Sequence, residues 1–270
     1  MPEPEVLAKD RLADELAVIE EAVEGAGELA LAQFRDGTKG WHKPDGTPVS
    51  DADLAVNRLL ADRLLGARPA YGWLSEETSD DLTVRHGALT YLIDPIDGTR
   101  AFLSGGDDWC VGVALLARGR PIAAVILQPV TGALYSAAVG LGASVNGRSI
   151  HVSDRRELED AHLIAHRGLG KPERWAVPWP KVRYGMTFAM LLRLCRVADG
   201  GFDGMVALGR KSDWDVAAGD LMVSEAGGRV TDLSGAPLTY GRPGMAQNGV
   251  IAAGPALMEL MIPLARGHRA

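Results

Sequence analysis

The stretch LTYLIDPIDGT, residues 89–99, joins an apolar run to two carboxylates. Its first five residues predict a short buried strand that ends at Asp94. Asp94 and Asp97 stand on either side of a proline turn, where carboxylate oxygens suit hard divalent cations such as Mg²⁺. Gly98 and Thr99 then place bare backbone N–H groups at the start of an expected helix, where a phosphate can dock. The alternative interpretation is a plain turn, because Asp-Gly is a common turn pair.

Two more acidic sites lie at predicted element boundaries nearer the N-terminus. Glu76 and Glu77 follow an apolar run at 71–74, which indicates another strand end. Asp53 lies in the first turn of a helix expected over 51–66, where carboxylates are favoured. Carboxylates therefore gather where elements begin and end, which is typical of functional sites.

A further pair, Asp213 and Asp215, flanks Trp214 at the head of a helix expected over 213–226. We interpret Asp213 as the N-cap of that helix. Asp215 can serve either the first helical turn or an ion, and these residues alone do not separate the two roles.

The remaining sequence predicts alternating helices and strands. A long amphipathic helix is expected over 12–34, and an antiparallel meander over 109–150 has turn signals at 118–119, 131–132 and 146–147. Later elements are expected as strands at 162–166, 203–208 and 249–253, helices at 187–198 and the C-terminus, and a long surface loop at 167–181. This order predicts a layered α+β fold with two sheets, divided into halves at 1–150 and 151–270.

Composition limits the class of protein. The chain has 270 residues with 47% hydrophobic and 23% charged residues, which excludes disorder as a whole-chain description. Its net charge of −7 argues against a non-specific partner of nucleic acid polymers or membrane surfaces. Cys110 and Cys195 lie too far apart for a thiolate zinc motif and are expected to be core residues. With no signal pattern and no spanning segment, we expect a cytoplasmic protein.

Three strings of the sequence together resemble a known family. WLSEET (73–78), LIDPIDGTRAF (92–102) and DWDVAAGDLMVSEAGG (213–228) match, in order and spacing, the inositol monophosphatase family of Mg²⁺-dependent phosphomonoesterases. The resemblance extends over nearly the whole chain. It implies an α/β/α/β/α sandwich of the inositol monophosphatase and fructose-1,6-bisphosphatase type, which would hold two or three Mg²⁺ ions.

The same resemblance implies roles for the residues at matching positions. The metal ligands would be Glu76, Asp94, Asp97, Asp215 and the backbone carbonyl of Ile96, most of them in the 1–150 half. Gly98 and Thr99 would contact the phosphate, and Asp53 would accept a hydrogen bond from Thr99. Asp53, Thr99 and Glu76 would then form the catalytic group.

The chemistry of phosphate esters agrees with this assignment. Hydrolysis of a phosphate monoester is so slow that a catalyst must supply up to about 10²¹-fold acceleration. A positioned general acid or base supplies typically about 10²–10⁴-fold, so side chains alone do not suffice. Clustered Mg²⁺ ions can activate a water and neutralise the charge that develops on the phosphoryl oxygens. The sequence contains no nucleophile motif that would indicate a phospho-enzyme.

The substrate pocket departs from that of inositol-hydrolysing members. Those members usually carry a glutamate where this chain has Leu208, and a Gly-Thr-Ala turn where it has Met186, Thr187 and Phe188. A polyol among such side chains would leave hydroxyls unpaired, at a cost of about 1–3 kcal/mol each. A flat base would pack well against them.

The strings around the first two motifs also resemble bacterial 3′(2′),5′-bisphosphate nucleotidases of the CysQ type. That resemblance implies removal of the 3′-phosphate of adenosine 3′,5′-bisphosphate, which yields AMP. The second phosphate would need a cation, and Arg183, Arg210 and Lys211 are the candidates. Each of them could equally be a solvated surface charge.

Other functions remain open from the sequence. The chain could be an inositol-1-monophosphatase or another sugar phosphatase, or a histidinol-phosphate phosphatase. A non-enzymatic partner of transcription or ribosome-assembly machinery would tolerate loss of metal ligands, whereas here every ligand position is filled. The expected partner is thus a small phosphate ester, preferably a nucleotide, bound by a monomer or homodimer.

Overall fold

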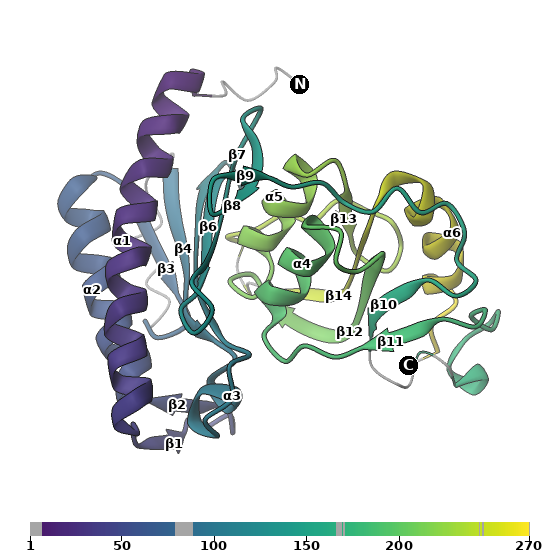
Figure 1. The fold of residues 1–270 in the computed structure, drawn as a ribbon, viewed down its shortest axis with the longest axis horizontal. Helices are drawn as coiled ribbons and strands as arrows, with labels where there is room; N and C mark the ends of the chain where they lie inside the picture. The colour runs from purple at the N-terminus through teal and green to yellow at the C-terminus, as the bar shows by residue number, and fades with distance from the viewer. Residues whose placement is uncertain are drawn as a thin grey trace.

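The computed structural model describes residues 7–78, 89–165, 169, 171–242, 244 and 246–269. Five layers stack in the order helices, sheet, helices, sheet and helix (Figure 1). This confirms the layered α+β fold with two sheets that the sequence pattern predicts, and the α/β/α/β/α sandwich that the family resemblance implies. In the described part of the chain, no helix is both long and apolar enough to cross a membrane.

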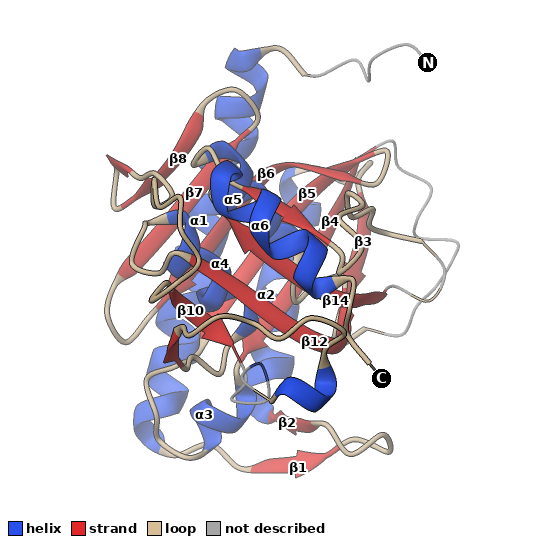
Figure 2. Cartoon of the chain, turned by 90° about the vertical axis from the view of Figure 1, so that its right-hand side faces the viewer, coloured by secondary structure: helices blue, strands red, loops and turns tan. Residues whose placement is uncertain are grey.

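The outer helical layers cover one face of each sheet. Helices α1 (Lys9–Asp36) and α2 (Asp51–Ala67) pack on a seven-stranded sheet, and α6 (Pro255–Ala265) lies over a five-stranded sheet (Figure 2). Helices α4 (Met190–Ala198) and α5 (Ala217–Glu225) form the layer between the two sheets (Figure 1).

The seven-stranded sheet follows the order of the sequence. Its strands are β3 (Gly72–Ser75), β4 (Leu89–Asp97), β5 (Cys110–Ala117), β6 (Arg120–Gln128), β7 (Ala133–Ala138), β8 (Gly142–Val145) and β9 (Arg148–Ser149). β3 pairs with β4 in parallel, and every later pair is antiparallel. At the last predicted turn Asn146 has φ 47° and Gly147 has φ 73°, the left-handed conformations of a type I′ hairpin. The predicted meander is therefore confirmed.

The five-stranded sheet is mixed. Its order is β11 (Arg183–Gly185), β10 (His162–Ala165), β12 (Gly204–Ser212), β14 (Ala246–Ala253) and β13 (Arg229–Thr231). Two small elements lie beside the larger sheet: the hairpin of β1 (Gly40–His42) with β2 (Pro48–Ser50), and the short helix α3 (Thr99–Leu103). β11 is an edge strand, and residues 186–189, which follow it, belong to neither sheet.

The first helical layer forms for reasons visible in the sequence. The apolar face of α1 is fully buried at Leu12, Ile19 and Val23, and burying each such side chain contributes about 1.5–3 kcal/mol. α2 begins with a capping box, in which the Ser50 side chain accepts from the Asp53 N–H and the Asp53 carboxylate accepts from the Ser50 N–H. Such a cap contributes about 0.5–2 kcal/mol and fixes the Asp53 side chain.

Two predicted helices begin later than the sequence indicates. α4 begins at Met190 rather than residue 187, because the Phe188 N–H donates to the Asp108 carboxylate outside the helix. α5 begins at Ala217 rather than residue 213, and the prediction of Asp213 as its side-chain N-cap is wrong. The Asp213 carboxylate instead accepts from the Gly241 N–H at 2.7 Å.

The predicted surface loop at 167–181 is only partly exposed. Trp175 and Trp179 are buried in the core beneath α6, with ring centroids 5.4 Å apart in an edge-to-face arrangement. Large indole rings bury too much apolar area to remain in solvent, and this explains the difference. Residues 166–168 and 170 lie outside the described residues.

The core between the sheets draws on both halves of the sequence. Leu92 and Ile126 from the larger sheet pack in one cluster with Leu191 and Met222 from the middle helices. The division of the chain at residue 150 stays a prediction. Cys110 and Cys195 are both free and buried, as predicted.

Candidate active site

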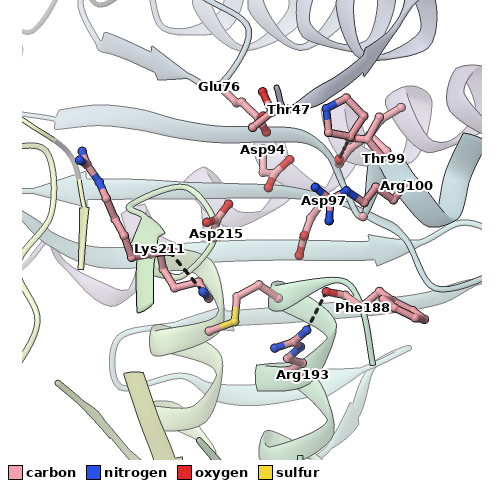
Figure 3. Close-up of a pocket in the computed structure, with 15 residues that line it drawn as sticks. Thr47, Glu76, Asp94, Asp97, Thr99, Arg100, Phe188, Arg193, Lys211 and Asp215 are labelled. Carbon is pink, nitrogen blue, oxygen red and sulfur yellow. Dashed lines mark hydrogen bonds between the residues drawn. The ribbon is translucent and has the colours of Figure 1, made fainter. Parts of the chain in front are cut away.

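A cavity of about 480 Å³ opens where the C-terminal ends of β4 and β12 meet the starts of α3 and α4 (Figure 3). Two groups of side chains line it. We call Glu76, Asp94, Asp97 and Asp215 the carboxylate wall, and Phe188, Arg193, Arg210 and Lys211 the leaving-group wall. Figure 3 shows Arg193 and Lys211 across the cavity from Glu76 and Asp94.

Asp94 and Asp97 reach the cavity from a single strand. β4 does not stop at Asp94 but continues to Asp97, and its pairing with β5 is irregular between these two residues. The Asp97 carboxylate accepts from the Leu191 N–H at 2.5 Å, at the N-terminus of α4. Orphan N–H groups and the helix dipole both favour a negative charge there.

The other two members of the carboxylate wall are held differently. The Asp215 carboxylate accepts from the Ser212 N–H at 2.8 Å. Glu76 forms an ion pair with Lys43, whose Nζ lies 3.1 Å from Glu76 Oε1 and 2.6 Å from Glu77 Oε1. Lys43 lies in the loop between β1 and β2, and the sequence pattern did not predict its contact with Glu76.

Burial raises the pKa of every carboxyl in this wall. The pKa rises to about 7 for Glu76 and about 7 for Asp97. For Asp94, burial comes first and repulsion from Asp97 and Glu76 adds to it. The pKa of Asp215 rises through burial too, although the hydrogen bond from Ser212 opposes the shift. Buried negative charges at this density favour a counter-cation.

The donor set fits a hard cation. All the side-chain donors are oxygens, as Mg²⁺ prefers, and buried Oδ1 of Asp94 has no hydrogen-bond partner. As they stand, no three His, Cys, Asp or Glu side chains among the described residues form a ready ligand group. Glu76 accepts a hydrogen bond from Lys43 instead, so its side chain would have to reorient before the carboxylate wall could bind an ion.

Asp53 and Thr99 meet at the edge of the carboxylate wall. Thr99 Oγ1 lies 3.2 Å from Asp53 Oδ1 and 3.0 Å from the Ile96 carbonyl oxygen. A hydroxyl has one hydrogen, so it donates to one of these acceptors at a time. Burial raises the pKa of Asp53 to about 6, against hydrogen bonds from Ser50 that lower it.

Gly98 lies at the turn predicted to contact the phosphate, which we call the phosphate turn. Its φ of 93° is left-handed, and a Cβ at this position would lie 2.6 Å from the Asp108 carbonyl oxygen. Only glycine fits both the conformation and the close approach. The turn is thereby packed directly against the 108–109 backbone.

Four positive side chains of the described residues line the cavity, and sequence reasoning missed two of them. Lys211 and Arg210, both predicted, line it together with Arg100 and Arg193. Burial lowers the pKa of Lys211, while the nearby Asp215 raises it. The sequence did not indicate Arg193 as a cavity residue, because its position within the helix predicted over 187–198 does not show which way its side chain points.

The predicted substrate-binding residues separate into two groups. Phe188 and Lys211 line the cavity, whereas Met186 and Thr187 line a neighbouring space of about 80 Å³ that shares Arg193 with it. Leu208 packs against the core beneath α6 instead. Arg183 lies on edge strand β11, where it donates to the Asp160 carbonyl oxygen at 3.3 Å. Met186, Thr187, Leu208 and Arg183 thus lie outside the main cavity, and their part in substrate binding stays a prediction.

Comparison with known proteins places this geometry in context. Residues 12–270 match the inositol monophosphatase family. The chain is 37% identical to a histidinol-phosphatase of Mycobacterium tuberculosis (77% of this chain, 83% of that protein). It is 36% identical to an inositol-1-monophosphatase of Rhizobium meliloti (69% and 73%). It is also 32% identical to the 3′(2′),5′-bisphosphate nucleotidase CysQ of Escherichia coli K12 (78% and 88%).

A solved structure agrees with the sequence relatives. The suhB extragenic suppressor protein of Bartonella henselae is similar with a TM-score of 0.79 and 29% identity, over 93% of this chain and 97% of that one. The names of the relatives differ in substrate, while the family match covers nearly the whole chain. The chain therefore belongs to the inositol monophosphatase family and is a Mg²⁺-dependent phosphatase.

Proposed function

We propose that this phosphatase hydrolyses the 3′-phosphate of adenosine 3′,5′-bisphosphate to give AMP and inorganic phosphate. The observation that carries the proposal is the pairing of two walls in one cavity: buried carboxylates on one side, and Lys211, Arg210 and an exposed Phe188 on the other. A substrate with two phosphates and a flat base offers a matching group to each feature.

The carboxylate wall would hold the metal. Glu76, Asp94, Asp97, Asp215 and the Ile96 carbonyl would bind Mg²⁺, which when bound activates water and neutralises charge on the phosphoryl oxygens. The upward pKa shifts of these carboxyls support the assignment, because a cation would relieve the repulsion that causes part of them.

Thr99 and Asp53 would orient the attacking water. When Thr99 donates its single hydrogen to Asp53, its lone pairs are free to accept a hydrogen bond from that water. The water oxygen forms a bond to phosphorus as the bond between phosphorus and the 3′ oxygen breaks. The attacking water loses one proton and the 3′ oxygen takes one up, so the products are AMP and inorganic phosphate. Asp53 is well placed for this role because the capping box fixes its carboxylate.

The leaving-group wall would select the rest of the substrate. Nζ of Lys211 donates to the carbonyl oxygens of Leu208 and Arg210, each at 3.2 Å, so the ammonium group is fixed near the cavity. A second phosphate would give the Lys211 ammonium group an anionic hydrogen-bond partner. Phe188, with 64% of its surface exposed, offers a ring for stacking against a base.

Steady-state kinetics on four esters tests the proposal: adenosine 3′,5′-bisphosphate, inositol-1-phosphate, histidinol phosphate and fructose-1,6-bisphosphate. We expect the nucleotide to be preferred over inositol-1-phosphate by at least about a hundredfold in kcat/KM, or about 2.7 kcal/mol. Preference for another ester would replace the nucleotidase assignment and leave the phosphatase assignment intact.

Comparing adenosine 3′,5′-bisphosphate with adenosine 3′-phosphate isolates the second phosphate. Lys211→Met should reduce the preference for the bisphosphate by about 10- to 150-fold, since a charged hydrogen bond contributes about 1.5–3 kcal/mol. Lys181→Met is the matched control, because Lys181 is paired with Asp160 on the exposed surface. An unchanged preference in Lys211→Met would remove this residue from phosphate binding.

A further inference from the structure

The segment between β11 and α4, residues 186–189, has no regular secondary structure, and its Phe188 lines the cavity. It carries Phe188 and Met186, which are 64% and 61% exposed and are the most exposed large apolar side chains in the described part of the chain. No sheet ladder holds this segment in place. Its position must therefore depend on contacts from side chains.

Charged side chains hold the main chain of Phe188 from both sides. Its N–H donates to Oδ2 of Asp108, and its carbonyl oxygen accepts from Nη2 of Arg193 at 3.2 Å. Nε of Arg193 also donates to the Thr187 carbonyl oxygen at 2.6 Å. Figure 3 shows the contact between Arg193 and Phe188 at the edge of the cavity. Hydrogen bonds to ionised groups are about twice as strong as neutral ones, so these contacts can fix an exposed segment.

Asp108 also contacts the phosphate turn through its backbone. Gly98 approaches the Asp108 carbonyl oxygen so closely that a Cβ would lie only 2.6 Å from it. The Ala189 side chain packs on the same turn, at 3.2 Å from that Cβ position. One residue therefore touches the phosphate turn with its main chain and the Phe188 segment with its carboxylate.

We propose that Asp108, together with Arg193, is a positioning residue that sets the distance between the phosphate turn and the Phe188 ring. The pair thereby determines how well an ester with a flat leaving group is bound relative to a small one. The identity of that leaving group rests on the proposed function. Positioning is sensitive to small displacements, because an error of about 1 Å can cost about 10²-fold in rate.

The test compares Asp108→Ala with the unaltered enzyme on two esters at saturating Mg²⁺. With adenosine 3′,5′-bisphosphate we expect KM to rise about tenfold with a small change in kcat. With glycerol 2-phosphate, which has no ring to contact Phe188, kcat and KM should stay within about twofold. Asp107→Ala is the matched control, because the neighbouring Asp107 is exposed and only its backbone carbonyl contacts Gln128.

Three more variants separate positioning from a purely structural role. Asp108→Asn keeps an acceptor for the Phe188 N–H and should restore most of the nucleotide affinity. Phe188→Ala should cost little more in an Asp108→Ala background than alone, since the ring would already be displaced. If Asp108→Ala does not fold, Asp108→Glu keeps the charge but adds a methylene, and it should show the same selective rise in KM.

Equal losses on both esters, or fully additive losses with Phe188→Ala, would overturn the positioning role. The proposed function is judged separately, by which ester the unaltered enzyme prefers. If that ester is not the nucleotide, it replaces the nucleotide in the comparison with glycerol 2-phosphate, and the selective loss remains the deciding result.

Discussion

The two walls of the cavity are built in contrasting ways. Asp94 and Asp97 are buried and project from a strand inside a seven-stranded sheet, whereas Phe188 is mostly exposed on a segment outside any sheet. Asp94 and Asp97 are thus fixed by the core, and Phe188 by a few hydrogen bonds. From this contrast we expect that substitutions in the exposed segment change substrate preference without disturbing the buried carboxylates.

Removing one carboxylate should impair the carboxylate wall and leave the leaving-group wall unchanged. Asp97→Asn should lower kcat by about 10³-fold, or about 4 kcal/mol, because a neutral amide is a poorer Mg²⁺ ligand. Since burial and repulsion already disfavour the charge at Asp97, the melting temperature without metal should not fall. Kinetics with added Mg²⁺ and thermal melts check both points, with Asp107→Asn as the control. Full activity in Asp97→Asn would exclude this residue as a ligand.

Thr99 and Asp53, which we propose orient the attacking water, should give the next largest effect. Thr99→Ala should lower kcat about 10²-fold or more while changing KM little, because orientation matters most in the transition state. Asp53→Asn should act similarly, and the double variant should lose little more than either single one. Ser104→Ala, which removes a hydroxyl at the end of α3, serves as the control. Multiplicative losses in the double variant would show that the two residues act independently.

Truncating the exposed ring tests the second wall. Phe188→Ala should reduce kcat/KM for adenosine 3′,5′-bisphosphate about 5- to 150-fold, corresponding to about 1–3 kcal/mol for one stacked base. Activity on glycerol 2-phosphate and the melting temperature should hardly change, since the ring is 64% exposed. Met186→Ala removes a similarly exposed side chain outside the main cavity and should have little effect. A depressed melting temperature with equal losses on both esters would assign Phe188 a structural role.

The smallest expected effect is on stability, and it concerns the carboxylate wall alone. Glu76 and Asp97 have pKa values of about 7 in the folded protein, above their ordinary values of 4.5 and 3.8. Between those limits the folded state keeps protons that the unfolded state has lost, so stability without metal should fall as pH rises from about 4 to about 7. Stabilisation by Mg²⁺ should therefore be larger at pH 8 than at pH 5.5. Melting curves with and without chelator measure this, and a pH-independent gain would contradict it.

The sequence could predict the carboxylate wall because its members lie in short motifs at element ends. Asp94, Asp97 and Asp215 line one cavity, as the resemblance to the family implied, although their roles as ligands stay predictions. The layered fold followed from periodicity and turn signals, which are local properties. Lys43 could not be found in this way, since its contact with Glu76 joins residues 33 positions apart.

The leaving-group wall was harder to predict because backbone irregularities decide it. β12 has a shift in register between Ala207 and Arg210, and Gly209 there has φ 77°. Such a bulge interrupts the regular alternation of faces, and beside it Lys211 lines the cavity while Leu208 packs against the core beneath α6. Residue spacing cannot reveal a bulge of this kind. The same holds for the segment at Phe188, where the Asp108 carboxylate delays the start of α4.

The irregular pairing of β4 has a consequence for how this motif can vary. Asp94 pairs with Gly112 and Asp97 with Cys110, so three steps along one strand match two along the other. Side chains an odd number of steps apart on a regular strand point to opposite faces. The additional residue reverses that parity and lets both aspartates serve the same cavity. If the same four residues were paired regularly, one of the two carboxylates would turn into the apolar interior, so the irregular pairing is as necessary to this motif as its acidic side chains.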